Sequence, residues 1–301
     1  MNLNNKSFNL QAPLTILVCL LLFAASLLFS EASNSMDSAG VVECQACHEN
    51  LVQNFFGSIH EREGFSSTPV QSCETCHGPG QDHIEEGSDP SKIYSFSHGM
   101  KSKGEEVCLK CHERGVTMHF AGSIHAVRDI SCTDCHRIHA PEPTNSLLKA
   151  DDEMTLCLSC HTRTRSAVMK SSHHPMREGK MNCSDCHNPH GTLTDSLIAG
   201  DTINEVCYQC HAEKRGPVLW DHISVREDCV NCHDPHGSNH QRLLKARVPY
   251  LCQRCHSETR HPGKLYDQSN LSTPEIYNRG CLNCHAAIHG SSHPSGRTFL
   301  R

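Results

Sequence analysis

The sequence predicts a mainly α-helical protein with extensive irregular loops and almost no β-sheet, built as an elongated array of repeated units. The 301-residue chain has 21 cysteines and 25 histidines but only 5% aromatic residues, so its side chains offer little apolar area for an ordinary core. One cysteine motif recurs ten times, and connections such as Gly78–Gly80 are rich in glycine and proline. These observations favour short helices at each motif, joined by irregular segments.

The N-terminal segment has the features of an export signal. Lys6 precedes an apolar run from Ala12 to Phe29, and the small residues Ser30 and Ala32 form a candidate cleavage site. We therefore assign residues 1–32 to a signal peptide. An uncleaved membrane anchor is the alternative, because the 18 residues of the apolar run are about the lower limit for spanning a bilayer. The net charge of −6 excludes the basic surface typical of nucleic-acid binding.

Apart from Cys19, every cysteine belongs to a C-x-x-C-H motif. The cysteine pairs are Cys44 and Cys47, Cys73 and Cys76, Cys108 and Cys111, Cys132 and Cys135, Cys157 and Cys160, Cys183 and Cys186, Cys207 and Cys210, Cys229 and Cys232, Cys252 and Cys255, and Cys281 and Cys284. The adjoining histidines are His48, His77, His112, His136, His161, His187, His211, His233, His256 and His285.

This spacing is the attachment signal of c-type haem. Residues at i, i+3 and i+4 share one face of a helical turn, so both sulfurs can meet one porphyrin edge while the histidine reaches the iron. Disulfides and zinc are the alternatives, but neither explains an adjacent histidine in all ten motifs. We expect ten covalently bound haem c groups, each with the motif histidine as its proximal ligand. The haems would also fill an interior that lacks aromatic side chains.

A second set of histidines supplies candidates for the sixth ligand of each iron. The motifs form five successive pairs. In each pair, one histidine follows closely after the second motif, and another follows later after the first motif. The short-spaced candidates are His83, His139, His190, His236 and His289, and the long-spaced candidates are His60, His125, His174, His222 and His261, with His173 as an alternative to His174. Methionine is the other possible ligand, but no methionine recurs in register with the motifs. The pattern therefore favours bis-histidine iron throughout.

The length of chain between the motif histidine and the short-spaced histidine decides which haem the latter can bind. Three residues extend roughly 10 Å at about 3.4 Å each, too little to round a porphyrin and return to its centre. His190 therefore cannot serve the haem held by His187, and the same holds for His139 and His236. Each of them must ligate a neighbouring haem. The long-spaced histidines could serve their own haem or another.

The motif pairs repeat along the chain. Their first cysteines are separated by 64, 49, 50 and 45 residues, and the segment from Ser146 to His161 is similar to that from Ser196 to His211. Such repeats favour an array in which each two-haem unit contacts mainly its neighbours.

Several segments together resemble the decahaem cytochromes of outer-membrane electron conduits, the MtrA/DmsE family. They are Cys73–His83, His173–Gly191, Leu219–Gly237 and Ile288–Phe299, and the similarity covers all ten motifs. The resemblance implies two fused pentahaem modules, at residues 33–170 and 171–301, and weakly favours His174 over His173. It also implies a continuous series of bis-histidine haems and insertion into an outer-membrane β-barrel porin, with the direction of electron flow left open.

We therefore expect a non-enzymatic electron carrier, exported to the periplasm and associated with the outer membrane. It would link a periplasmic or inner-membrane cytochrome donor with an extracellular multihaem cytochrome or terminal reductase. A freely diffusing periplasmic shuttle is the first alternative. A multihaem reductase for an oxyanion is less favoured, because such enzymes typically replace one motif histidine with lysine, and all ten motifs here have histidine.

Overall fold

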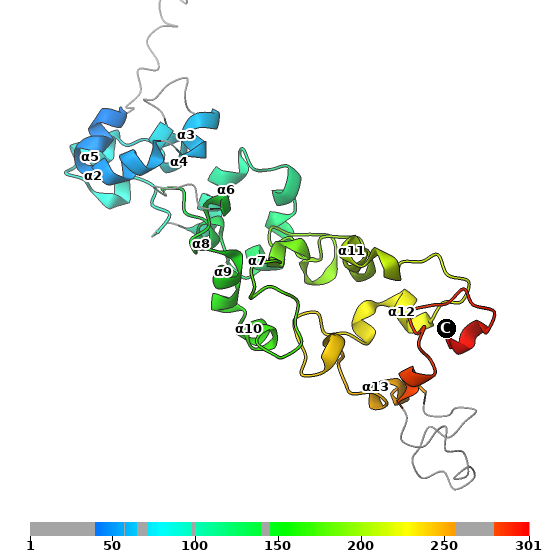
Figure 1. Ribbon diagram of the computed structural model, residues 1–301. Helices are drawn as coiled ribbons and strands as arrows, with labels where there is room; N and C mark the ends of the chain where they lie inside the picture. Colours follow the sequence, from blue (N-terminus) through cyan, green and yellow to red (C-terminus); the bar gives the residue numbers. More distant parts are fainter. Residues whose placement is uncertain are drawn as a thin grey trace, which may run out of the picture. The chain divides into compact units, whose positions relative to one another are not determined.

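The computed structural model describes residues 40–56, 58–64, 72–97, 100–139, 145–256 and 280–300. Figure 1 shows short helices joined by irregular connections. Within these ranges the chain forms isolated β-bridges but no β-strand. The predicted helical, loop-rich fold without a sheet is therefore confirmed.

Some predicted features lie outside the described residues. They are the signal segment 1–32, the unpaired Cys19, and the candidate ligand His261. Within the described ranges, no helix combines the length and apolar character needed to cross a bilayer.

The chain divides into two compact units, which meet in sequence between Gly99 and Met100. The first unit contains helices α2 (Val41–Phe55), α3 (Ile59–Gly64), α4 (Ser72–His77) and α5 (Gln81–Glu85), and the 3-10 helix η2 (Pro90–Lys92). The predicted boundary between pentahaem modules near residue 170 stays a prediction.

The second unit holds eight α-helices and ten 3-10 helices among its described residues. The α-helices are α6 (Lys101–Leu109), α7 (Ile124–Val127), α8 (Cys132–Cys135), α9 (Glu153–Cys160), α10 (Thr162–Val168), α11 (Ile203–Cys210), α12 (Ile223–Glu227) and α13 (Tyr250–Gln253). The 3-10 helices are η3 (Gly115–Thr117), η4 (Phe120–Gly122), η5 (Asn145–Leu147), η6 (Cys183–Asp185), η7 (Asp195–Leu197), η8 (Ala212–Lys214), η9 (Cys229–Asn231), η10 (Gln241–Leu243), η12 (Cys281–Asn283) and η13 (Gly296–Thr298).

Few apolar side chains are buried in either unit. Among the described residues, the buried hydrophobic side chains are Val41, Val52, Phe120, Leu148, Leu158, Val168, Val206 and Phe299. Others, such as Leu193 and Leu219, are largely exposed. A chain of this length normally buries many more, so side chains alone do not make its core. This agrees with the expectation that the bound haems form most of the apolar interior.

Each motif in the second unit forms one closed helical turn. The backbone N–H of the motif histidine donates to the carbonyl of the first cysteine at 2.9–3.1 Å in all eight motifs from Cys108 onward. The first motif of a pair ends a helix, as in α9 and α11, whose N-termini are capped by the side chains of Asp152 and Thr202. The second motif forms a single short turn with no longer helix before it, as in η6 and η9.

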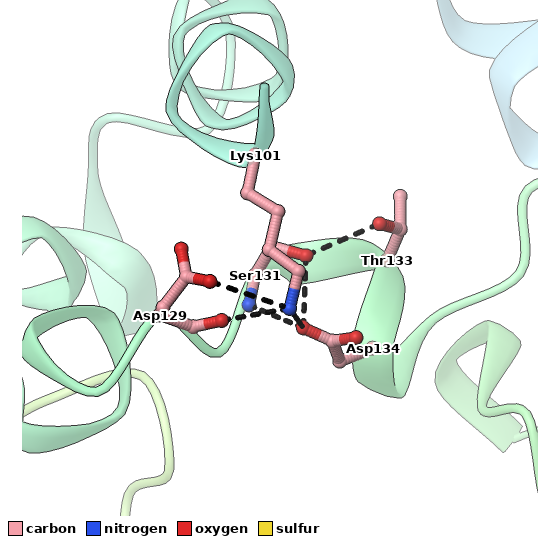
Figure 2. A network of polar contacts seen from close by, with 5 residues as sticks. All are labelled: Lys101, Asp129, Ser131, Thr133 and Asp134. Atoms are coloured by element: carbon pink, nitrogen blue, oxygen red, sulfur yellow. Dashed lines mark hydrogen bonds and ion pairs between the residues drawn. The ribbon is translucent and has the colours of Figure 1, made fainter. Parts of the chain in front are cut away.

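Nearby polar side chains cap these single turns. Figure 2 shows the contacts at α8. The Asp134 carboxylate accepts hydrogen bonds from the Ser131 backbone N–H at 2.7 Å and from the Lys101 ammonium at 3.0 Å. Lys101 also donates to the carbonyl of Asp129 at 2.8 Å, which links α6 to the turn before α8. Burial alone would raise the pKa of Asp134, but the bonds from Ser131 and Lys101 outweigh it and hold this pKa below its usual value.

The capping carboxylate makes a testable contribution to stability. Replacing Asp134 with asparagine should lower the free energy of unfolding by about 1 kcal/mol at pH 7, because the amide oxygen can still accept from Ser131 but both hydrogen bonds lose the carboxylate's charge. Because the folded-state pKa of Asp134 is depressed, the ionised carboxylate stabilises fully above its ordinary pKa of about 4, and this stabilisation is lost as the pH falls through the folded-state pKa. Chemical unfolding at several pH values, followed by circular dichroism, measures the difference between the two proteins.

Asp129 provides a matched control for this experiment. Its carboxylate is 82% exposed and lies 3.9 Å from Lys101, so Asp129→Asn should change stability by less than about 0.5 kcal/mol. An equal loss in both variants, or a loss in Asp134→Asn that persists at low pH, would contradict the capping role.

Glycines after the short-spaced histidines bring successive repeats together. Gly191 and Gly237 have positive φ angles of 112° and 140°, and a Cβ on either would overlap a backbone carbonyl oxygen, that of His119 or of Ala167. Only glycine permits this close approach. Beside Gly237, the backbones of Ser172 and Ser238 exchange two hydrogen bonds, at 2.9 and 2.7 Å.

Replacing Gly237 with alanine should destabilise the second unit by about 3 kcal/mol, because the Cβ would force two backbones apart as well as strain the turn. The control is Gly179→Ala, where φ is 64° but nothing lies within 4 Å of the added Cβ. This control should cost only about 1 kcal/mol of backbone strain. Denaturant unfolding measures the stability of both variants. Similar losses of stability would mean that the close contact with Ala167 contributes nothing.

Candidate haem-iron sites

The structure brings the motifs together in the predicted pairs. The first cysteine of one motif hydrogen-bonds to the first cysteine of its partner, in the pairs Cys44 and Cys73, Cys108 and Cys132, Cys157 and Cys183, Cys207 and Cys229, and Cys252 and Cys281. Burial, together with the partner thiol, raises the pKa of Cys207 to about 12 and that of Cys252 to about 11.

The second cysteines connect one pair with the next. Burial raises the pKa of Cys135, and the nearby Cys160 adds to the effect. Burial also raises the pKa of Cys186, which lies near both Cys207 and Cys210, and that of Cys232, which lies near Cys255. First cysteines therefore meet inside a pair, and the second cysteines Cys135, Cys186 and Cys232 each lie near a cysteine of the following pair.

Seven proximal histidines each face one candidate sixth ligand. The separations between ring centroids are 6.4 Å for His48 and His83, 6.1 Å for His161 and His125, 5.9 Å for His136 and His190, 6.4 Å for His211 and His174, 6.0 Å for His187 and His236, 6.1 Å for His256 and His222, and 6.2 Å for His233 and His289. The first of these pairs belongs to the first unit and the others to the second.

This common separation fits an iron held between two imidazoles. Two metal–imidazole bonds of about 2 Å each, plus about 1 Å from each nitrogen to its ring centre, give about 6 Å. Imidazoles in direct van der Waals stacking would lie closer together. The donor set of two neutral imidazoles is also the one that low-spin c-type haem accepts. The residues therefore fit the group that the motifs imply.

The pairing follows a regular order along the second unit. His190, His236 and His289 each face the proximal histidine of a motif two positions earlier. The long-spaced histidines do the reverse, so that His125, His174 and His222 each face a motif two positions later. His190 thus lies opposite His136 and not opposite His187, as its short reach requires.

Backbone carbonyls orient many of these imidazoles. The Nδ1–H of His136, His187 and His233 donates to the carbonyls of Ser146, Ser196 and Arg242 at 2.7–2.8 Å. His77, His83, His125, His174 and His285 bond in the same way to other carbonyls. A bond from Nδ1 leaves Nε2 as the free nitrogen, which is how proteins commonly hold a metal-binding histidine.

The carbonyl acceptors are functional positions that the sequence analysis missed. Ser146, Ser196 and Arg242 have φ angles of 55–60°, and the leucine that follows each of them also has a positive φ. Two consecutive non-glycine residues in this region are strained, and such strain is usually retained where the conformation serves a purpose. Here it turns a carbonyl toward the proximal imidazole. The signal was the recurrence of Ser-Leu-Leu, Ser-Leu-Ile and Arg-Leu-Leu nine or ten residues after the motif histidine.

Burial keeps the short-spaced ligand candidates neutral. It lowers the pKa of His190, His236 and His289, and neighbouring histidines strengthen the effect. The pKa of His222 is lowered for the same reason. A neutral imidazole is the form that binds a metal.

His173 and His174 differ in their hydrogen bonds. The Nδ1 of His173 donates to the Lys170 carbonyl at 2.7 Å, and its Nε2 lies 3.2 Å from Glu178 and 2.9 Å from the guanidinium of Arg177. Both ring nitrogens of His173 are therefore engaged within the chain. His174 instead donates from Nδ1 to the Pro235 carbonyl at 2.8 Å and faces His211 with the other side of its ring.

This difference gives a prediction for two adjacent variants. His174→Ala should convert one low-spin iron to a high-spin form that binds carbon monoxide, because the imidazole facing His211 is lost. His173→Ala should leave every iron low-spin. Magnetic circular dichroism measures the spin states, with mass spectrometry to check that all haems are retained. The opposite pattern would assign the ligand role to His173.

Three candidate ligands stay predictions. His60 lies in α3, His139 follows the fourth motif, and His261 is outside the described residues. Their counterparts by elimination are the proximal histidines His77, His112 and His285.

The sequence of this chain matches known cytochrome families. Residues 173–216 and 222–261 match the doubled CXXCH motif, and residues 73–160 match the NrfB-like c-type cytochrome proteins. The chain is also 40% identical over 281 residues to the multihaem cytochrome MtrA of Shewanella baltica (strain OS185), over 90% of this chain and 84% of that protein.

The paired motifs, the spacing of the imidazoles and these matches define a multihaem c-type cytochrome with covalently bound haem c. The similarity over nearly the whole chain shows more: the protein belongs to the MtrA family of multihaem cytochromes. Its activity is accordingly electron transfer, and the resemblance seen in the sequence is confirmed.

Proposed function

We propose that this protein holds ten haem c groups, each between two histidines, and passes electrons along them across the outer membrane. The observation that carries the proposal is the repeated separation of 5.9–6.4 Å between each of seven proximal imidazoles and one further imidazole. All ten motifs are complete in the sequence, and ten further histidines are available as second ligands.

The residues of this chain have three tasks in such a role. The cysteines attach the haems at motifs that lie close together, since Cys157 hydrogen-bonds to Cys183 and Cys186 lies near Cys207. The histidines close both axial positions of each iron, and the carbonyls fix their ring orientation. Bound haem supplies the one-electron chemistry, while the protein sets spacing, ligation and electrostatics.

Closed axial positions favour electron transfer over catalysis. A reductase for a small oxyanion needs an iron with an open position, and each of the seven proximal histidines above faces a second imidazole. In the second unit, the short-spaced ligands also tie neighbouring haems together, because His190 and His236 each follow one motif and face another. A series of linked haems is suited to conduction over a distance.

Location and partners complete the proposal. The export signal in residues 1–32 and the family support a periplasmic protein associated with the outer membrane. There it would insert into an outer-membrane β-barrel porin. A periplasmic or inner-membrane cytochrome would exchange electrons with one end, and an extracellular multihaem cytochrome or terminal reductase with the other.

Three measurements test the proposal. Intact mass spectrometry of the exported protein should show ten haem additions to a chain processed near residue 32. Affinity purification from detergent-solubilised outer membranes should recover the protein with a β-barrel partner, and liposomes that contain the complex should reduce an external acceptor from an internal donor. Fewer than ten haems would contradict the ligation pattern. Recovery of all the protein in the soluble periplasmic fraction would instead identify a diffusing shuttle.

A further inference from the structure

Three long-spaced histidines in the second unit form a matched set. His125, His174 and His222 lie at corresponding places in successive repeats, and their rings are 6.1–6.4 Å from those of His161, His211 and His256. All three proximal partners belong to the first motif of a pair, and all three are exposed. On the proximal side, the Nδ1 of His211 lies 3.8 Å from the exposed Glu213 carboxylate, and the larger difference in the set is on the long-spaced side.

Two members of the set have the same acceptor. The Nδ1–H of His125 donates to the Pro189 carbonyl at 2.9 Å, and that of His174 donates to the Pro235 carbonyl at 2.8 Å. Each proline immediately precedes a short-spaced histidine. One peptide segment thus orients the second ligand of one iron and supplies the second ligand of another.

His222 has lost this bond although its surroundings are otherwise retained. Trp220 and Ser291 exchange two backbone hydrogen bonds, at 2.9 and 3.0 Å, as Ser172 and Ser238 do one repeat earlier. Ile288 occupies the position of Pro235. Yet the Nδ1 of His222 is buried and has no hydrogen-bond partner among the residues that the structure describes.

Phe299 covers the imidazole of His222 instead. The two ring centroids are 5.6 Å apart with the planes inclined at 70°, and Phe299 is itself buried. An aromatic ring offers an N–H group at most a weak contact. A buried polar group without a partner in a native structure calls for an explanation, and this one lies on a proposed iron ligand.

The missing acceptor changes how strongly His222 donates to a metal. A hydrogen bond from Nδ1–H to a carbonyl makes the other ring nitrogen a stronger base. A stronger donor stabilises ferric iron, which carries more positive charge than ferrous iron, and so lowers the reduction potential. Hydrogen bonding around the axial ligands and burial are established means by which proteins adjust haem potentials.

We propose that the iron held by His222 and His256 has the highest reduction potential of the matched set, because Phe299 replaces the carbonyl acceptor of His222. Phe299 is a positioning residue that acts through His222. The inference rests on the proposed bis-histidine ligation. An electron on the series would reside longer at this haem than at those of His161 or His211.

The test restores an acceptor in the full-length holoprotein. Phe299 has a φ of 53°, a conformation that asparagine adopts readily, so Phe299→Asn places an amide oxygen beside His222 with little backbone cost. One haem should become about tenfold harder to reduce at equilibrium, which is a fall of about 59 mV in its midpoint potential. Spectroelectrochemistry of the variant and the native protein measures this change as a difference between the two curves.

Phe299→Leu is the matched control, because it removes the ring without adding an acceptor. Its curve should not show the downward shift. An equal shift in both variants would mean that packing, and not hydrogen bonding, sets the potential, and no shift in Phe299→Asn would also overturn the proposal. Should Phe299→Asn lose haem, the longer amide in Phe299→Gln decides by the same criterion.

Spin state separates this inference from the proposed function. Magnetic circular dichroism of the native protein reports whether every iron is low-spin. A high-spin iron in the native protein would mean that the proposed bis-histidine ligation itself is wrong. Low-spin iron throughout, with no shift in either amide variant, would leave the ligation intact and overturn only the role of Phe299.

Discussion

Replacing His190 with alanine will open the iron held by His136 and leave the iron held by His187 with both of its ligands. The His190 ring lies 5.9 Å from that of His136, whereas His187 faces His236 at 6.0 Å. Burial holds His190 as a neutral imidazole, and its loss leaves one axial position to solvent or an added ligand. Because His190 belongs to the segment after His187, the change also removes a bond that ties two haems together.

The expected readout is one high-spin iron that binds carbon monoxide, with no change in haem count by mass spectrometry. A methionine can mark the iron that opens. In His136→Met, one iron should show the near-infrared band of methionine ligation by magnetic circular dichroism. Adding His190→Ala should abolish the histidine–methionine signal, while adding His236→Ala should leave it intact. The reverse result would mean that His190 serves the His187 haem.

Preventing haem attachment will leave the chain unfolded. Folding orders each residue at a cost of about 1–2 kcal/mol in backbone entropy, and burial of apolar surface must offset it. Only eight hydrophobic residues are buried among those described, so the polypeptide alone lacks the apolar contacts to do so. The bound groups must supply most of the remainder, as structural metals do in small metalloproteins.

We therefore expect the chain made without haem attachment to lose its helical circular dichroism signal and its cooperative unfolding transition, and to be cleaved by protease throughout. Removing one attachment site, with Cys207→Ser and Cys210→Ser together, should have a smaller effect. In a repeat array each unit is stabilised mainly by its neighbours, so the damage should centre on α11 and the repeats beside it. A haem-free chain with a cooperative transition would contradict this account.

The local features of the fold were predictable because they depend on short-range chemistry. A histidine four residues after a cysteine closes one helical turn, and the structure shows this bond in every motif from Cys108 onward. The glycine and proline content indicated irregular connections, and the few aromatic residues indicated that side chains would not form the core. The strained carbonyls at Ser146, Ser196 and Arg242 were missed because propensity gives no reason to expect positive φ at serine or arginine.

The number of attachment motifs, the chemistry of their ligands and the pairing of the motifs all follow from the amino-acid sequence, because each depends on residues close together in the chain. The sequence also shows that His190 cannot bind the haem held by His187, because three residues are too short to pass around the porphyrin edge. The partners of His125, His174 and His222 do not follow, since a spacing of 11 to 13 residues after the motif histidine limits distance and not direction. Folding alone brought His125 opposite His161, engaged both nitrogens of His173 and packed the ring of Phe299 against that of His222. These contacts join segments that are far apart in the chain, and only packing of the repeats decides them.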